Sequence, residues 1–342
     1  MKHKIYIVLL LITGTGFTLT SFISWKVKAT PVADKAVQAS VVKAFSLLQT
    51  TGATFIGKAR CASCHHSTMT SMIAATMKRK GISGVDTTAV LRDMAMTGTL
   101  DFVGNPNLNN QFVSAKFLAP YVLLGLDAEK HAPDFTTDIA VNYVISQALP
   151  DGSFKAEYAR VPLECGDIHL TALSIRAIQL YAPQSTLSQA QELMQHTKQW
   201  LEKQHTTDQQ ELSFQLLGMH WCGSNEAVQA GIAKSLIALQ NKDGGWSQLP
   251  TMASDAYATG QSMYALIESG AADSKSEVFQ KGIHFLLNTQ DKTGAWLVTT
   301  RSNPIQPFVN SNFPPYDDNQ FISAAATNWA TLALAEALPD IK

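Results

Sequence analysis

Residues 281–296 read Lys-Gly-Ile-His-Phe-Leu-Leu-Asn-Thr-Gln-Asp-Lys-Thr-Gly-Ala-Trp, the most informative segment of this 342-residue chain. Its ending, Gln-x-x-x-Gly-x-Trp, also occurs at residues 240–246, fifty residues earlier. A repeat with this period is typical of one supersecondary unit stacked on copies of itself. In such a unit a helix ends at Gln, Gly supplies the positive φ of a helix C-cap, and the indole covers the turn. The segment therefore predicts a helical repeat protein.

Weaker copies of the ending lie upstream, where Gln147 leads through Gly152 to Phe154 and Gln49 leads through Gly52. Segments rich in Ala and other small residues follow the turns, as a crowded inner ring of helices would require. Apolar spacing and connectivity predict six helix pairs. We expect the outer helices near residues 35–49, 86–97, 134–147, 187–203, 225–240 and 275–290, and the inner helices near 61–80, 113–128, 166–182, 209–221, 255–270 and 319–337. We expect the aromatic turn residues on the outer rim of the ring: Phe55, Phe154, Trp246 and Trp296.

The composition supports an all-α, two-layered ring. Charged residues make up 15% of the chain against about a quarter in ordinary proteins, and such a low charge suits inner helices covered by outer ones. Alternating β-branched runs of convincing length are absent from the sequence, which argues against a large sheet. The repeat region holds no Pro/Ser-rich linker, so we expect a single domain over residues 30–342. The net charge of −1 and the scattered basic residues exclude a nucleic-acid footprint.

The N-terminus is typical of an export signal. Residues 1–4 form a positive n-region, residues 5–12 form a short apolar region, and Val27-Lys28-Ala29 fits a cleavage site. The apolar character extends weakly to Ile23, so an uncleaved anchor with membrane association is the alternative to a signal peptide over residues 1–29. Both interpretations place the mature domain in an oxidising compartment, in the periplasm or on the outer face of the cytoplasmic membrane.

Residues 61–65 read Cys-Ala-Ser-Cys-His, the attachment signature for c-type haem. In that interpretation Cys61 and Cys64 form thioethers, and His65 becomes the proximal iron ligand. An oxidising compartment favours this assignment. The alternatives are a Cys61–Cys64 disulfide beside a solvated histidine, and a metal or redox thiol site. A thioredoxin-like role is disfavoured because no βαβ pattern surrounds the motif.

Three histidines away from the motif are candidates for a second iron ligand: His131, His169 and His220. A haem iron with an open sixth coordination position fits the sequence equally well. The other two cysteines, Cys165 and Cys222, are explained by a disulfide between successive pairs or by two buried thiols. A zinc site with Cys165 and His169 is disfavoured, because Asp167 would point away from both side chains.

The repeat resembles the QW motif of the squalene–hopene cyclase and prenyltransferase superfamily, specifically at residues 281–296, well at 240–246 and loosely elsewhere. The resemblance implies an (α/α)6 toroid around a largely apolar central cavity. Three further segments resemble an exported bacterial subgroup of cyclase-like proteins that carries the cytochrome-c-type signature, and these are residues 61–66, 254–261 and 314–329.

The departures from the superfamily concern its chemistry. Squalene–hopene cyclases protonate an alkene with an Asp-x-Asp-Asp run, which this sequence lacks. The nearest acidic residues are Asp167, Asp255 and Asp318, all close to the starts of inner helices, where a cap and the helix dipole explain a carboxylate. The zinc ligands and basic diphosphate cluster of the prenyltransferases are also not evident. The chain is about half of a two-domain cyclase, and shared fold does not license shared chemistry.

We therefore expect an exported toroid protein with covalent haem c that serves electron transfer or binds an apolar small molecule, with a redox partner in the first case. One alternative is a cyclase-like enzyme acting on an isoprenoid, with Asp255 or Asp318 as the acid. The other is a disulfide-stabilised binding module. We expect the motif at the mouth of the ring where the inner helices begin, shielded by the long connections at residues 98–112, 155–165 and 297–317.

Overall fold

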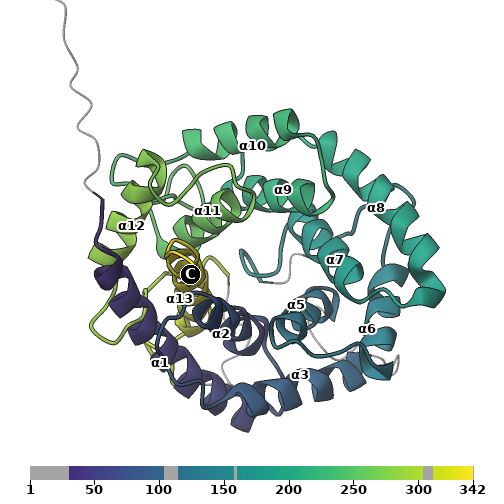
Figure 1. Ribbon diagram of the computed structural model, residues 1–342, viewed down its shortest axis with the longest axis horizontal. Helices are drawn as coiled ribbons and strands as arrows, with labels where there is room; N and C mark the ends of the chain where they lie inside the picture. Colours follow the sequence, from purple (N-terminus) through teal and green to yellow (C-terminus); the bar gives the residue numbers. More distant parts are fainter. Residues whose placement is uncertain (1–30, 104–114, 158–159, 303–310, 342) are drawn as a thin grey trace, which may run out of the picture.

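Two concentric rings of helices form the computed structural model, which describes residues 31–103, 115–157, 160–302 and 311–341 (Figure 1). The twelve α-helices of these residues alternate along the chain between the outer and the inner ring. The outer helices are α1 (Asp34–Ala59), α3 (Ala89–Val103), α6 (Phe135–Ser146), α8 (Leu187–Glu202), α10 (Glu226–Ala238) and α12 (Glu277–Thr289). The inner helices are α2 (Met69–Arg79), α5 (Ala115–Ala128), α7 (Asp167–Tyr181), α9 (Gln209–Trp221), α11 (Ala256–Glu268) and α13 (Gln320–Glu336).

The expected (α/α)6 toroid is thus confirmed, including the second and fourth pairs, which rested on apolar spacing alone. The ring closes where α13 packs between α11 and α2 and also contacts α1. Small residues allow this close packing, because a Cβ at Gly260 of α11 would lie 2.5 Å from the backbone nitrogen of Ala330 on α13. No helix in the described part of the chain is long and apolar enough to span a bilayer. The expected signal or anchor, residues 1–29, lies outside the described residues.

The turns at Trp246 and Trp296 are equivalent, as the repeat predicts. Each indole N–H donates a 2.8 Å hydrogen bond to the carbonyl oxygen ten residues upstream. Each backbone N–H donates to a threonine hydroxyl on the following inner helix, at 2.9 and 3.0 Å. The backbone N–H of Phe154 makes the same bond to Thr171 at 2.9 Å, so this looser copy is also a true repeat turn. The three rings are not on the outer rim, because all are at most 1% exposed between the two layers.

The glutamine of each full repeat ties its turn to the next outer helix. Gln240 donates through Nε2 to the carbonyl oxygens of Gly244 and Val278, at 2.9 and 2.8 Å. Gln290 donates to Gly294 and Ser40 in the same way, at 3.1 Å each. The motif therefore stabilises contacts between neighbouring repeats as well as its own turn.

The expected turn at Gln49, Gly52 and Phe55 is wrong, because α1 continues through all three residues to Ala59. Gly52 has a different role here. A Cβ at this position would lie 2.4 Å from the carbonyl oxygen of His66, so the glycine allows a close approach of two segments. Gln49 still bonds the start of the next repeat, since its Oε1 accepts the backbone N–H of Thr87 at 2.8 Å.

All six inner helices run in the same direction. A cavity of 160 Å³ on the ring axis is lined by residues from the last turns of every inner helix, which places their C-terminal ends at one mouth. Their N-terminal ends, including the Cys-x-x-Cys-His motif before α2, therefore lie at the opposite mouth, as we expected. The two mouths are separated by about 20 Å, the length of a 13-residue helix.

Candidate functional site

A π-helical turn, η1 (Cys64–Thr68), presents the motif and leads directly into α2. Ser63 precedes the turn in an extended conformation, and its hydroxyl accepts the backbone N–H of His65 at 3.3 Å. Such a cap satisfies one of the unpaired donors at the start of a helix. Asn328 of α13 donates to the carbonyl oxygen of His65, which anchors the turn to the last inner helix.

The two motif cysteines are free thiols that the fold shields unequally. Cys61 is half-buried, whereas Cys64 is only 6% exposed. Burial raises the pKa of both thiols, and the nearby carboxylate of Glu164 raises that of Cys64 further. Both thiols are therefore protonated at neutral pH. The structure does not join them in the disulfide that was the alternative to haem.

The suggested disulfide between Cys165 and Cys222 is wrong. Gln210 in the first turn of α9 donates to the carbonyl oxygen of Cys165 at 3.2 Å, so Cys165 lies at the start of that helix. Cys222 follows the last residue of α9, about 18 Å away at 1.5 Å per residue. A disulfide requires Cα atoms within about 7 Å.

His65 is a buried histidine with one ring nitrogen that has no partner among the described residues. Its side chain is 7% exposed, and its Nε2 has no hydrogen-bond partner among the described residues. Burial, with smaller electrostatic contributions from His66, Arg160 and His169, holds the pKa of His65 well below its usual value. The imidazole is therefore neutral, which is the form that binds a metal.

His169 is the one candidate for a second iron ligand that the structure brings near His65. The ring of Tyr121 lies between them, with its centroid 5.6 Å from that of His65, and its hydroxyl is 3.2 Å from Nε2 of His169. Nδ1 of His169 lies 3.1 Å from the carbonyl oxygen of Cys165, and the ring stacks on Phe214 at 3.9 Å. Burial lowers the pKa of His169 to about 3.

The other two candidates lie elsewhere. His131 follows the C-terminal end of α5 and is 3.2 Å from carboxylates of both Asp93 and Asp134. His220 is in the last turn of α9, at the mouth opposite the motif. The sequence could not separate these histidines, because their distances from His65 depend on the closure of the ring.

The three long connections reach the motif where they are described. The end of α3 provides Thr99, whose hydroxyl accepts the backbone N–H of Ala62 at 2.7 Å. Ser311 is 3.0 Å from Nε2 of His66, whose ring stacks on Phe55 at 4.9 Å. Residues 104–112 and 303–310 of these connections lie outside the described residues.

The third connection, before α7, extends into the middle of the ring (Figure 1). Its described part carries an ion pair between Arg160 and Glu164 beside the motif, because both charges act on Cys64. The carbonyl oxygen of Pro162 accepts a 3.1 Å hydrogen bond from Gln210 on α9. This connection therefore covers the motif from the ring axis.

The three candidate acids differ in their environments. Asp255 is the N-cap of α11, as expected, and accepts the N–H of Ala258 at 2.9 Å and Nε2 of Gln248 at 3.0 Å. Burial raises its pKa despite these bonds. Asp167 is the first residue of α7 rather than its cap, and its carboxylate binds the Ala156 N–H and the Lys155 ammonium.

Asp318 is exposed and is not a cap, because Asn319 holds the N-cap position of α13. Its neighbour Asp317 accepts the Asn319 N–H at 2.8 Å, so the local turn uses the other carboxylate. Asp255 is therefore a partly buried acid whose pKa is raised by burial. The zinc interpretation has no support either, since the described residues contain no group of three or more His, Cys, Asp or Glu that could hold a metal ion.

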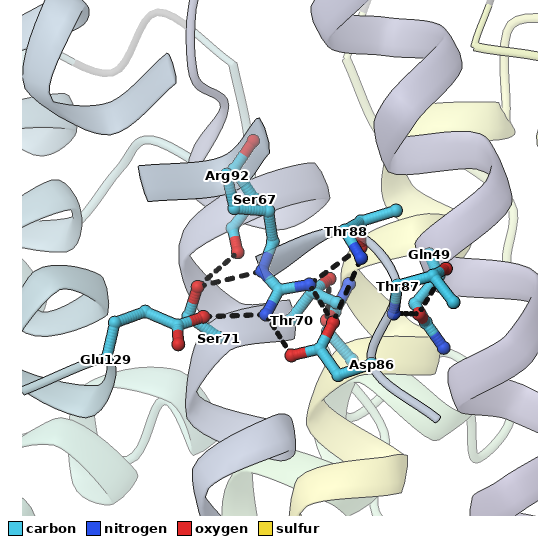
Figure 2. A network of polar contacts seen from close by, with 10 residues as sticks. Gln49, Ser67, Thr70, Ser71, Asp86, Thr87, Thr88, Arg92 and Glu129 are labelled. Carbon is cyan, nitrogen blue, oxygen red and sulfur yellow. Dashed lines mark hydrogen bonds and ion pairs between the residues drawn. The ribbon is translucent and has the colours of Figure 1, made fainter. Parts of the chain in front are cut away.

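Sequence reasoning missed a buried ionic network around Arg92 of α3 (Figure 2). The guanidinium is paired with Asp86 at 2.7 Å and with Glu129 at 2.6 Å, and it donates to Ser71 of α2 at 3.0 Å. Arg92 is 1% exposed. The network joins α3 to α2 and to the end of α5, so it has a structural role between the first two repeats.

Glu211 in the first turn of α9 was also missed. Its Oε2 accepts the N–H of Ile168 at 3.0 Å at the start of α7, whereas its Oε1 is buried without a partner among the described residues. Burial raises the pKa of this carboxyl to about 7, and the charge of Asp208 adds to the effect. Position 166 favours glycine because its φ is 93°, and a Cβ there would also displace Oε1 of Glu211.

Glu211 should make stability depend on pH. The pKa of Glu211 is higher in the folded chain, at about 7, than the ordinary value of 4.5 for a glutamate carboxyl. Its contribution to stability is therefore fully present below about 4.5 and is lost as pH rises to about 7. We expect Glu211→Gln to remove this loss. The measurement is the urea-unfolding free energy of both proteins from pH 4 to about 8. A difference between them that does not grow over this window would contradict the assignment.

Comparisons with known proteins support the fold. No protein-family model matches the sequence, and no curated protein does. The type II terpene cyclase MstE from Scytonema, without ligand, is 12% identical with a TM-score of 0.56, covering 90% of this chain and 99% of that one. A variant of the same cyclase in complex with geranylgeranyl dihydroxybenzoate, its substrate, is 12% identical with a TM-score of 0.57, covering 90% and 98%.

A possible member of the GH105 family from Salmonella enterica serovar Paratyphi A is also similar. It is 10% identical with a TM-score of 0.52, and the match covers 95% of this chain and 99% of that one. At these identities the likeness shows a shared α/α toroid and nothing about shared chemistry.

Proposed function

We propose that this chain is an exported toroid protein that carries covalent haem c, attached through Cys61 and Cys64 with His65 as an iron ligand. The observation that carries the proposal is Nε2 of His65, a buried acceptor without a partner among the described residues, directly after two free thiols. A buried polar atom without a partner costs free energy, and an iron ion would satisfy this one.

The residues fit the group chemically. Thioether bonds need reduced cysteines, and both motif cysteines are thiols. Iron coordination needs a neutral imidazole, and burial keeps His65 neutral. Arg160 supplies a positive charge that acts on both Cys64 and His65.

When bound, haem would supply a one-electron couple or an open coordination position. The chain would set the surroundings of that couple. Tyr121 and His169 form a neutral hydrogen-bonded pair beside His65, and the connection that carries Arg160 and Glu164 brings an ion pair close to the motif. A protein tunes an iron centre through the burial of its ligands and through the polar groups around them. We infer a role in electron transfer or in binding an apolar ligand.

The low exposure of Cys64, 6%, has a consequence for attachment. A folded chain would not offer this thiol to a haem vinyl group, so both bonds must form before the first repeat closes. We therefore expect haem only when the chain is exported in cells with a c-type maturation system, and none when haem is added to the purified folded apoprotein.

The test is a denaturing gel of the exported protein stained for haem, with the pyridine spectrum of its reduced form and the mass of the mature chain. Covalent haem should stay with the polypeptide and disappear in Cys61→Ala/Cys64→Ala. The matched control is Cys165→Ala/Cys222→Ala, which removes the two thiols outside the motif and should keep the haem. The mass also reports whether residues 1–29 are removed.

A colourless protein of unmodified mass, made while a control cytochrome matures normally, would refute the haem proposal. A mass lower by two hydrogens would then favour the disulfide-stabilised binding module. The cyclase-like alternative relies on Asp255, the partly buried acid with a raised pKa. Turnover of a polyprenyl substrate that Asp255→Asn abolishes would put this alternative first.

A further inference from the structure

The mouth opposite the motif contains a cavity that the proposed function does not use. It has a volume of 160 Å³, about five water molecules at roughly 30 Å³ each, and every inner helix contributes to its wall. Leu124, Tyr264 and Leu332 form a buried floor, each at most 7% exposed. The rim is polar and more accessible.

The charge on this rim is negative. Asp127 of α5, Glu268 of α11 and Glu336 of α13 supply three carboxylates to the lining, against the guanidinium of Arg176 on α7. Arg79 of α2 adds a second positive charge that also acts on Tyr264. The carboxylate of Glu336 forms an ion pair with Arg79, which is not part of the cavity lining. The six inner helices also end here, and each helix C-terminus adds about half a negative charge. The local field therefore favours a cation.

One aromatic residue of the cavity, Trp221, already contacts a cation. The guanidinium carbon of Arg176 lies 5.5 Å from the ring centroid of Trp221, within the range of a cation–π contact. Nε1 of Trp221, on the edge of the indole, donates to Glu268 at 3.4 Å, so the carboxylate adjoins the edge of the ring whose face contacts Arg176. The ring of Tyr264 lines the cavity and packs on Trp329 behind it, with centroids 5.7 Å apart.

We propose that this mouth binds a small alkylammonium ion. Trp221 and Tyr264 receive the alkyl groups, and the carboxylate of Glu268 lies against the positive nitrogen. Aromatic faces next to a carboxylate are the usual means of recognising such ions. Arg176 occupies the same aromatic face in the free protein, so it competes with the ligand. The site lies about 20 Å from the motif and does not depend on haem.

The probe is choline, measured by titration calorimetry with the mature full-length protein at low ionic strength. Its neutral isostere, neohexyl alcohol, and the anion of tert-butylacetic acid are the matched ligands. We expect choline to bind at least about tenfold more tightly than the alcohol, and the anion not to bind. The affinity should fall as salt is raised, because the rim charges are partly exposed.

Two variants should act in opposite directions. Glu268→Gln keeps the shape of the side chain and should weaken choline binding about tenfold, whereas Arg176→Gln removes the competing cation and should strengthen it. The matched control is Glu192→Gln, which removes an exposed carboxylate on α8 outside the cavity. Thermal melting of each variant checks that the fold is retained, and Trp221→Leu should abolish choline binding.

Several results would overturn the proposal. The first two are no binding of choline at millimolar concentrations, and equal affinities for choline and the neutral alcohol. The others are binding of the anion that is lost in Arg176→Gln, and an unchanged affinity for choline in a folded Glu268→Gln variant. None of these results bears on haem attachment, which the denaturing gel tests by itself.

Discussion

Arg92→Met should lower the free energy of unfolding by about 3–5 kcal/mol, because it leaves two carboxylates in the protein interior without their cation. Asp86 and Glu129 are both paired with this guanidinium, and neither side chain is more than 11% exposed. In the native chain the close ion pairs offset the cost of burying these charges. The guanidinium of Arg92 also donates hydrogen bonds to Ser71, Thr88 and Asp86. Removal of the central charge alone is therefore strongly destabilising.

Urea unfolding followed by circular dichroism measures this effect, and the melting temperature should fall by on the order of 10 °C. The matched control is Arg79→Met, which removes an arginine that also contacts two carboxylates, Glu336 and Asp340, but is 51% exposed. Exposed pairs contribute about 1 kcal/mol or less. Equal losses in the two variants would contradict the importance of burial.

A second result separates the charge from the packing. Arg92→Met combined with Asp86→Asn and Glu129→Gln removes the uncompensated charges and should recover part of the lost stability. If the triple variant were less stable than Arg92→Met, the arginine would act through its packing and hydrogen bonds.

Trp296→Ala should cost about 3–5 kcal/mol, the range for removing a large buried aromatic side chain. The indole is 1% exposed between α12 and α13, and its N–H satisfies the carbonyl oxygen of Leu286 at the end of α12. The substitution therefore leaves both a void and an unpaired acceptor. Because Trp246 makes the same bonds in the preceding repeat, Trp246→Ala should lose a similar amount.

The same urea titrations measure both variants, with Trp200→Ala on the outer helix α8 as the control. Trp200 is partly exposed, so its loss should cost much less than that of either repeat tryptophan. Clearly unequal losses at Trp246 and Trp296 would show that the two turns are not energetically equivalent.

The helix pairs were predictable because their signals are local. A helix is specified by apolar residues at neighbouring turns, and the turn after it by a glycine that adopts positive φ, as Gly244 and Gly294 do at 92° and 98°. The expected role of these glycines as helix C-caps is wrong, because the C-caps of α10 and α12 are Leu239 and Gln290. Asp255 was predicted as a cap for the same reason, since the bond that defines it spans three residues. The Cys-x-x-Cys-His motif was recognised from five consecutive residues.

The wrong turn at Gly52 has a tertiary cause. The sequence around it matches the repeat loosely, but the glycine is required by the carbonyl oxygen of His66, which packs against α1. Local sequence cannot distinguish a glycine that adopts a special backbone angle from one that allows close approach. The prediction of Asp318 as a helix cap was wrong for a similar reason. The adjacent Asp317 accepts the hydrogen bond of the local turn, and the sequence pattern does not distinguish the two carboxylates.

The neighbours of His65 were beyond the sequence altogether. Tyr121 and His169 are separated by 48 residues and meet because two inner helices pack in parallel, and Arg92 reaches Glu129 across 37 residues. The sequence alone therefore determined the helices, their order and the presence of the motif, because these depend on contacts between near neighbours. Only the closed ring decided which histidine lies beside His65, which carboxylates are buried and where the axial cavity lies, because these depend on which side chains the ring encloses.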